Sequence, residues 1–331
     1  MQICMMHPSF AGLDLDTLEK QKQFFKPTTG GCACVFGGLP ASVRVTSEIT
    51  PMGVTNYVPA DWDSVESLSP ADFHARCWSD EKKVLVDVRN HYESRIGYFV
   101  DPKTGEKAIT PEIRRFSQWP QYVKTHGLEL SGGAGEKEGR QIMTYCTGGI
   151  RCEKGVRWMA EKMERRDGDV VCTLKGGIAG YLMWMDEEIK AGRKRPEESL
   201  FRGKNYVFDG RGSTSLSEGA MEEKVASCHV CGAAEDRLSK CRTEKCHLVL
   251  VVCAACEETA DPRCCESCLH LDLESQINER DHAKKPKPIC ICEIEREARL
   301  WENKVSMPKT QGWRKGKKKT DRVSIQPKTI N

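Results

Sequence analysis

The most constraining feature of the sequence is a short apolar run at 142–145 that ends in Cys146 and leads through two glycines to Arg151. Apolar side chains then recur at helical spacing from residue 154, so the segment indicates a buried strand, a tight loop and a helix. Backbone N–H groups in such a loop converge on an anion, and a helix N-terminus favours negative charge. Arg151 adds a positive charge, so we expect Cys146 to be a thiolate and a nucleophile.

The length of this loop determines which group can fit against the thiolate, and so which reactions the thiolate can carry out. Four residues separate Cys146 from Arg151, whereas a phosphatase loop needs five because a tetrahedral phosphate must fit against the amides. The shorter loop suits one extra sulfur atom on the cysteine, a persulfide, better than a phosphate. We predict Cys146 and Arg151 as catalytic residues. The backbone amides predicted to bind an anion are those of Thr147, Gly148, Gly149 and Ile150.

The pattern around the loop is typical of an α/β domain with a mostly parallel sheet. Apolar runs at 83–88, 141–146 and 169–174 suit buried strands, and helical patterns at 154–165 and 178–190 alternate with them. Arg89, Cys146 and Lys175 follow the carboxyl ends of these strands, where such sheets bind ligands. Further helices are expected at 14–25, 69–76, 116–123 and 294–304, and further strands at 44–50 and 205–209.

Cysteine is abundant and unevenly distributed. Of 18 cysteines, nine lie between Cys228 and Cys268. A small secreted disulfide scaffold would spread its cysteines along a short chain, whereas this clustering, without a secretory signal, indicates metal binding in a reducing compartment. The predicted metal ligands are Cys228, Cys231, Cys241, Cys246, Cys253, Cys256, Cys264, Cys265 and Cys268.

The spacing of these cysteines predicts two structural zinc ions, because Cys-x2-Cys pairs supply two thiolates each to a tetrahedral site. One ion is assigned to Cys228, Cys231, Cys253 and Cys256. The second is assigned to Cys241, Cys246, Cys268 and one of Cys264 or Cys265. Sequential and interleaved pairings both fit, and free or disulfide-bonded thiols are the alternative. Cys290 and Cys292 are not predicted as ligands.

The charge of the chain lies mainly at its C-terminal end. The whole sequence has a net charge of +3, but from Trp301 onward nine basic residues face only Glu302 and Asp321. Together with a zinc module, this tail is a candidate surface for an RNA backbone; a solvated or targeting tail is the alternative. No apolar run approaches a membrane span, so we expect no membrane partner and a cytoplasmic location, with an organelle left open.

Several motifs together resemble one family. They are Asp87-Val-Arg-Asn-His-Tyr-Glu93, Ile96-Gly-Tyr-Phe99, the loop at 146–154, Leu174-Lys-Gly-Gly-Ile178, Tyr206-Val-Phe-Asp209 and the cysteines at 228–268. Over residues 44–270 the chain resembles the rhodanese-like tRNA uridine-5-hydroxylase family, whose animal relatives are called thiosulfate sulfurtransferase/rhodanese-like domain proteins. The resemblance implies a five-stranded parallel sheet with helices on both faces and Cys146 as catalytic cysteine. It also implies oxygen-dependent hydroxylation of a wobble uridine, with tRNA as partner and dioxygen as co-substrate.

The resemblance also divides the chain. We expect an N-terminal arm at 1–65 that matches only the end of the family's N-terminal domain, a rhodanese-like domain at 66–209, a cysteine-rich zinc module at 210–275 and a largely disordered basic tail at 276–331. Asp87 and Arg89 are expected to support the site or to cap their strand as an ion pair. Cys152 is either a resolving thiol for Cys146 or a core residue.

Three hypotheses for the function remain open at this point. The first is tRNA uridine hydroxylation that depends on Cys146. The second is sulfur transfer, in which Cys146 takes a sulfur atom from thiosulfate or a similar small donor. The third is a non-catalytic scaffold that binds zinc and RNA, against which the intact loop at 146–151 counts.

Overall fold

A computed structural model describes residues 12, 14–25, 46, 48–130, 139–163, 165–209, 211–217, 224–243, 246–277 and 290–300. The basic tail beyond residue 300 and most of the arm before residue 46 lie outside these residues. Within the arm, α2 spans Leu18–Phe25, inside the helix expected at 14–25. The strand expected at 44–50 is wrong for residues 46 and 48–50, which are the part of it that the structure describes and which adopt no strand.

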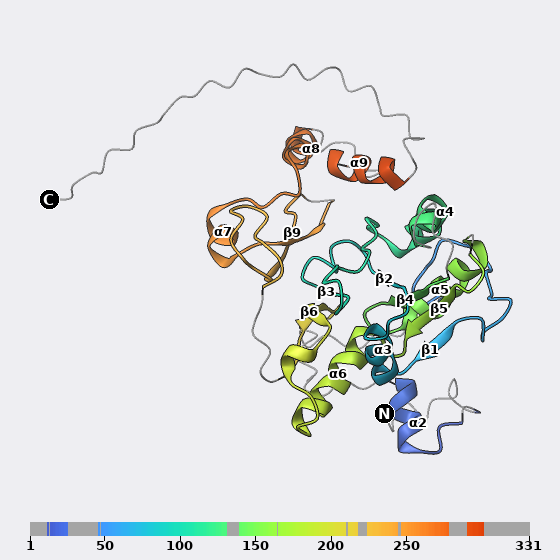
Figure 1. Cartoon of the computed structure of the whole chain (residues 1–331). Helices are drawn as coiled ribbons and strands as arrows, with labels where there is room; N and C mark the ends of the chain where they lie inside the picture. The colour runs from blue at the N-terminus through green and yellow to red at the C-terminus, as the bar shows by residue number, and fades with distance from the viewer. Residues whose placement is uncertain are drawn as a thin grey trace.

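A four-stranded sheet forms the centre of the α/β unit (Figure 1). Its strands are β1 (Glu66–Leu68), β2 (Lys83–Asp87), β4 (Gln141–Tyr145) and β5 (Val170–Leu174), in the order β1-β5-β4-β2. All three neighbouring pairs are parallel. The expectation of a parallel sheet is therefore confirmed, although β1 was missed because three residues show no periodicity.

The fifth strand implied by the resemblance is reduced to one bridge in the described residues. Ile109 pairs with Val86 in parallel fashion at the free edge of β2. Its N–H donates to the carbonyl of Leu85 at 2.8 Å, and its carbonyl accepts from Asp87 at 2.9 Å. Pro111 follows two residues later and has no N–H to extend the ladder, which accounts for the short pairing.

Helices cover both faces of the sheet. On one face α3 (Pro70–Cys77) and α6 (Gly177–Lys190) bury Phe73 and Tyr181 against strand residues such as Met143. On the other face α4 (Trp119–Leu130), which follows the short helix η3 (Phe116–Gln118), packs beside α5 (Ile150–Lys162) and buries Trp119. These contacts remove the apolar faces of the helices from water and provide most of the driving force for this arrangement.

Local signals explain where these helices begin. Ser69 caps α3, accepting the N–H of Asp72 at 3.2 Å, and Pro70 occupies the first turn, as the sequence predicts. Helix α5 begins at Ile150, four residues before the predicted start at 154. The reason is Gly149, which adopts the left-handed region with φ of +91° and turns the loop directly into the helix.

Short strands connect the sheet to the cysteine-rich module. β3 (Gly97–Phe99) pairs antiparallel with β6 (Phe201–Gly203), and β7 (Asn205–Tyr206) pairs with β8 (Ser213–Thr214). The short 3-10 helix η4 (Pro196–Glu198) precedes β6. The strand expected at 205–209 is thus only two residues long.

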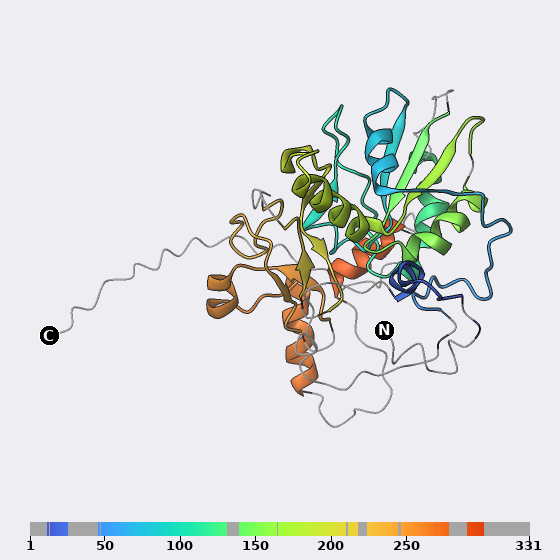
Figure 2. The same ribbon diagram turned by 90° about the horizontal axis from the view of Figure 1, so that it is seen from below.

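In the part that the structure describes, the cysteine-rich module contains a hairpin and two helices, and a later helix packs against α4. The hairpin is β9 (Leu238–Lys240) with β10 (Val249–Val251), and α7 (Ala254–Thr259) and α8 (Glu266–Ile277) follow. Helix α9 (Ile291–Leu300) lies between α8 and α4 in Figure 1 and beside the green helices in Figure 2. None of the described helices is long and apolar enough to cross a membrane.

Candidate active site and metal centre

Cys146 stands at the carboxyl end of β4, where the chain turns into α5. Its Sγ accepts the backbone N–H of Gly149 at 3.2 Å, and the side chain is only 1% exposed. The left-handed conformation of Gly149 aims this amide at the sulfur. The loop is therefore folded around the thiol, as its spacing predicts.

The start of α6 closes the loop from the opposite side. The N–H groups of Ile178 and Ala179 donate to the carbonyls of Cys146 and Thr147 at 2.9 and 3.0 Å. Gly177 has φ of +60°, and a Cβ there would lie 2.4 Å from the Cys146 carbonyl oxygen. Only glycine fits at this position. The Gly-Gly pair in the 174–178 motif was the sequence signal for this contact, but its role was not deduced.

Arg151 is engaged by a carboxylate. Its Nη1 and Nη2 donate to Oε1 and Oε2 of Glu93 at 2.6 and 2.7 Å, and Nη2 also donates to Oγ1 of Thr147 at 2.9 Å. Glu93 is fully buried, and its carboxylate accepts the Asn90 N–H at 3.1 Å. A two-point ion pair of this kind fixes the guanidinium in one place. Sequence reasoning missed Glu93 as a site residue, although it ends the 87–93 motif.

The surroundings of Cys146 favour its thiolate form. Burial alone would raise the pKa of Cys146, but the Cys152 thiol, the charge of Arg151 and the N–H groups of Cys152 and Gly149 outweigh burial and lower the pKa to about 6. Burial and the neighbouring thiolate raise the pKa of Cys152 instead. The two sulfurs therefore differ: at neutral pH the surroundings favour the thiolate at Cys146 and the protonated thiol at Cys152.

Asp87 and Arg89 form a buried ion pair at the end of β2. Nε and Nη2 of Arg89 donate to Oδ1 and Oδ2 of Asp87 at 2.9 and 2.7 Å, and Nη2 also donates to the Gly97 carbonyl at 2.7 Å. Both side chains are completely buried. The pair joins the end of β2 to β3 and is shielded from solvent.

The first set of predicted metal ligands comes together in space. The sulfurs of Cys228, Cys231, Cys253 and Cys256 all lie within 4.8 Å of one another, and those of Cys231 and Cys253 are 3.8 Å apart. The Cys253 N–H donates to Sγ of Cys228 at 3.4 Å, as amides around a metal-bound thiolate do. Four cysteine sulfurs at this separation fit a tetrahedral structural site.

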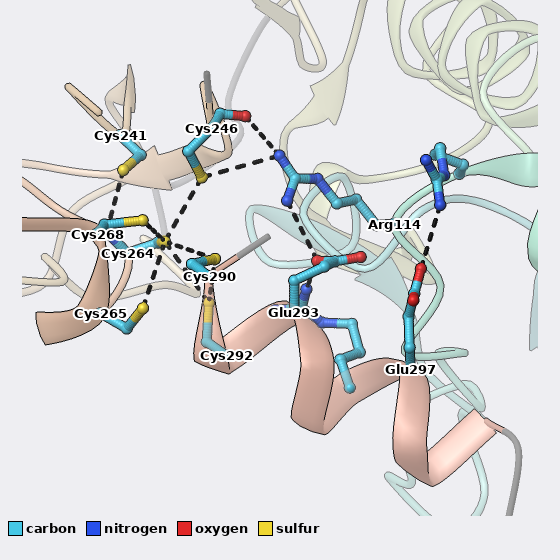
Figure 3. A network of polar contacts seen from close by, with 12 residues as sticks. Arg114, Cys241, Cys246, Cys264, Cys265, Cys268, Cys290, Cys292, Glu293 and Glu297 are labelled. Atoms are coloured by element: carbon cyan, nitrogen blue, oxygen red, sulfur yellow. Dashed lines mark hydrogen bonds and ion pairs between the residues drawn. The ribbon is translucent and has the colours of Figure 1, made fainter. Parts of the chain in front are cut away.

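The second set is larger than the sequence predicts. Cys241, Cys246, Cys264 and Cys268 bring their sulfurs within 4.8 Å of one another, and so do Cys264, Cys265, Cys268 and Cys290 (Figure 3). None of the cysteines in the described residues is paired in a disulfide. The spacing gave no reason to include Cys290, because 21 residues separate it from Cys268.

Comparison with known proteins bears on both parts of the molecule. The Rhodanase C-terminal family model matches residues 202–269. A tRNA uridine(34) hydroxylase of Leptospira interrogans is 38% identical over 212 residues, which cover 63% of this chain and 50% of that protein. A tRNA uridine(34) hydroxylase of Citrobacter koseri is 34% identical over 210 residues, covering 62% of this chain and 51% of that protein.

The chain is a rhodanese-like relative of the tRNA uridine(34) hydroxylases. Rhodanese-like domain-containing protein 6 of Arabidopsis thaliana is also similar, at 32% identity over 267 residues, covering 78% of this chain and 40% of that protein. The chain spans about half the length of these curated relatives. The resemblance predicted from the motifs is thereby confirmed.

An exposed aromatic side chain lies at the outer side of this rhodanese-like loop. The guanidinium of Arg151 lies 5.7 Å from the ring centre of Phe208, which is 64% exposed. The Tyr206 ring lies between Phe208 and Tyr92, with centroid distances of 5.0 and 5.5 Å. A partly wet aromatic face next to the loop is a surface on which a planar ring can stack.

A cavity of about 660 Å³ lies elsewhere, between α4, α5 and α9. Lys124, Trp158 and Leu300 are among its walls, and none of the predicted site residues lines it. The assignment of the active site to Cys146 therefore depends on the chemistry of the loop.

Proposed function

We propose that this chain takes part in tRNA modification by hydroxylating carbon 5 of a uridine, with Cys146 as its essential residue. Dioxygen is the co-substrate: one oxygen atom enters the base, and an external two-electron donor reduces the other to water. One observation carries the proposal: Sγ of Cys146 accepts the Gly149 amide inside a closed six-residue loop, in a chain whose relatives are named for this reaction. The lowered pKa of Cys146 supports a thiolate at neutral pH.

The loop residues divide the work around this thiolate. The Gly149 amide and the charge of Arg151 stabilise the negative sulfur, and the Cys152 thiol donates to it. Glu93 holds Arg151, which through Thr147 also holds the loop. Arg151 thus acts on the sulfur through its charge while its N–H groups are engaged by Glu93 and Thr147.

The substrate side of the proposal depends on the aromatic residues. A uridine must leave its stack in the anticodon loop to reach a buried sulfur, and enzymes that act on a base hold the displaced ring between side chains. Phe208, exposed beside Arg151, is suitably placed to stack on that ring. We propose tRNA as the macromolecular partner and a cytoplasmic location.

The test is mass spectrometry of modified nucleosides in tRNA from cells that lack the protein. We expect 5-hydroxyuridine derivatives to disappear and to return when the chain is expressed again. Unchanged levels of these nucleosides in the deficient cells would overturn the proposal. Return of the nucleosides with a Cys146 variant would instead favour a non-catalytic scaffold.

Sulfur transfer is the second candidate function, and the size of the loop favours it. In this reaction the Cys146 thiolate attacks the outer sulfur of thiosulfate, a persulfide forms and sulfite leaves. Incubation of purified protein with thiosulfate should then add the mass of one sulfur atom to the peptide that contains Cys146. No added mass with thiosulfate or another small donor would rule this candidate out.

The cysteine-rich module has a structural role in either case. We propose that zinc occupies both cysteine sets, because four thiolates closed off by protein leave no open position for catalysis. We further propose that the rhodanese-like domain at 66–209 and the module at 210–275 are two units of the chain, which the short strands after residue 200 connect. Elemental analysis that finds no zinc in the purified protein would refute this.

A further inference from the structure

Six cysteines from three segments of the chain surround Cys264. The Sγ of Cys264 lies 3.2 Å from that of Cys268, 3.5 Å from Cys292, 3.6 Å from Cys246 and 3.7 Å from Cys290. Cys265 is 3.9 Å away, and Cys241 accepts the Cys264 N–H at 3.4 Å (Figure 3). One zinc ion binds four sulfurs, so this set holds more ligands than one site uses.

The seven sulfurs contain two complete groups of four. Cys264 and Cys268 belong to both; Cys241 and Cys246 complete one group, and Cys265 and Cys290 complete the other. A zinc–sulfur distance of about 2.3 Å places the corners of a ZnS4 tetrahedron about 3.8 Å apart. The Sγ–Sγ distances from Cys264 to Cys246, Cys268 and Cys290 are between 3.2 and 3.7 Å. They are close to this edge length, as expected if Cys264 is a corner of both tetrahedra.

We propose that the second cysteine set is a binuclear centre, in which two zinc ions share the thiolates of Cys264 and Cys268. A cysteine sulfur has lone pairs for two metal ions, so two tetrahedra can share one edge with six cysteines. The chain therefore binds three zinc ions, one in the first set and two here. The sulfur of Cys292 is 3.3 Å from that of Cys290. Cys292 is not one of the six ligands; its thiol can donate a hydrogen bond to the Cys290 thiolate.

The charge of such a centre agrees with its surroundings. Two divalent ions and six thiolates leave a net charge of −2, which needs a cation when partly buried. Nη2 of Arg114 lies 3.9 Å from the Cys246 sulfur and donates to the Cys246 carbonyl at 2.5 Å. Arg114 comes from the rhodanese-like unit, so the compensating charge reaches the centre from outside the module.

The second ion gives α9 a reason to lie where it does. Cys290 precedes the helix directly, and the Ile291 N–H donates to Ser267 at the start of α8 at 2.9 Å. Further along, Glu293 pairs with Arg114 at 3.2 Å (Figure 3). Glu297 accepts from Gln118 at 3.0 Å. The binuclear centre thus joins the module, α9 and the rhodanese-like unit at one point.

The first test is the zinc content of the full-length chain, measured by elemental analysis and native mass spectrometry. We expect three zinc ions per chain, and a value of two would overturn the proposal. The double variant Cys290→Ala, Cys292→Ala should retain two. The matched control Cys77→Ala, Cys172→Ala changes cysteines buried in the rhodanese-like unit and should retain three. An unchanged count of three in the first double variant would also contradict the proposal.

The second test examines the bridge without any substitution. After zinc is replaced by cadmium-113, two of three cadmium resonances should show scalar coupling to each other, because a shared sulfur transmits it. The third resonance, from the Cys228 set, should show none. Three uncoupled resonances would exclude shared thiolates. Neither test measures enzyme activity, so both are independent of the hydroxylase proposal.

Discussion

The loop at Cys146 and the cysteine set around Cys264 both gather thiols, but they treat the sulfur in opposite ways. At Cys146 an amide, a neighbouring thiol and an arginine that is itself engaged by Glu93 together favour a single thiolate. Around Cys264, by contrast, the sulfurs of Cys268, Cys290 and Cys292 lie within 4 Å of the Cys264 sulfur. In the roles proposed above, the first arrangement would leave an electron pair for a substrate, whereas the second would commit its electron pairs to metal. Residue type alone therefore decides neither role.

Removal of metal should affect the two regions most unequally. Structural zinc sites contribute about 10–16 kcal/mol of apparent binding free energy to folding. A strong chelator should therefore unfold the module and release α9 while the sheet keeps its structure. Hydrogen exchange should rise at 228–268 and 290–300 and stay low in β4 and β5. Equal exchange in all these segments would show that the module does not depend on metal.

Loss of Glu93 should destabilise the loop. Replacing Glu93 by Gln leaves the charge of Arg151 buried without its partner. Such a change typically lowers the free energy of unfolding by about 3–5 kcal/mol. The control is Glu187→Gln on the exposed surface of α6, which should change stability by less than about 0.5 kcal/mol. Urea unfolding measures both variants. A similar effect in the two variants would mean that the buried pair contributes little.

The titration of Cys146 separates a reactive thiolate from inert core thiols. Its pKa is lowered from 9.0 to about 6, so the thiolate should form as the pH rises through 6. This shift stabilises the folded state relative to the unfolded state. The stabilisation is fully present above pH 9.0 and is lost as the pH falls through 6. The ultraviolet absorbance of thiolate, taken as wild type minus Cys146→Ala, reports the midpoint. A midpoint near 9 would contradict the proposed electrostatics.

The smallest expected effect concerns substrate contact at the loop. Replacing Phe208 by Ala should weaken tRNA binding by about 1–3 kcal/mol, the usual worth of one stacked base. The control is Trp78→Ala, an exposed aromatic at the end of α3. A raised KM with little change in kcat is expected for Phe208→Ala alone. An equal rise for Trp78→Ala would indicate a nonspecific effect.

Local patterns in the sequence predict the parts of this molecule that depend on neighbouring residues. The strand, loop and helix at 142–154 and the cysteine pairs of the first set follow from spacing within a few residues. The Glu93–Arg151 pair, the close approach of Gly177 and the presence of Cys290 beside Cys264 join positions far apart in the chain. Such contacts depend on how the elements pack, which no local period encodes.

The most direct test of the account compares two matched cysteine variants. Cells that lack the protein are supplied with Cys146→Ala or with Cys172→Ala, a buried cysteine in β5, and 5-hydroxyuridine derivatives in their tRNA are measured. We predict that the Cys172 variant restores these nucleosides and that the Cys146 variant leaves them below about a thousandth of the wild-type level. Restoration by the Cys146 variant would contradict the central role of this thiolate.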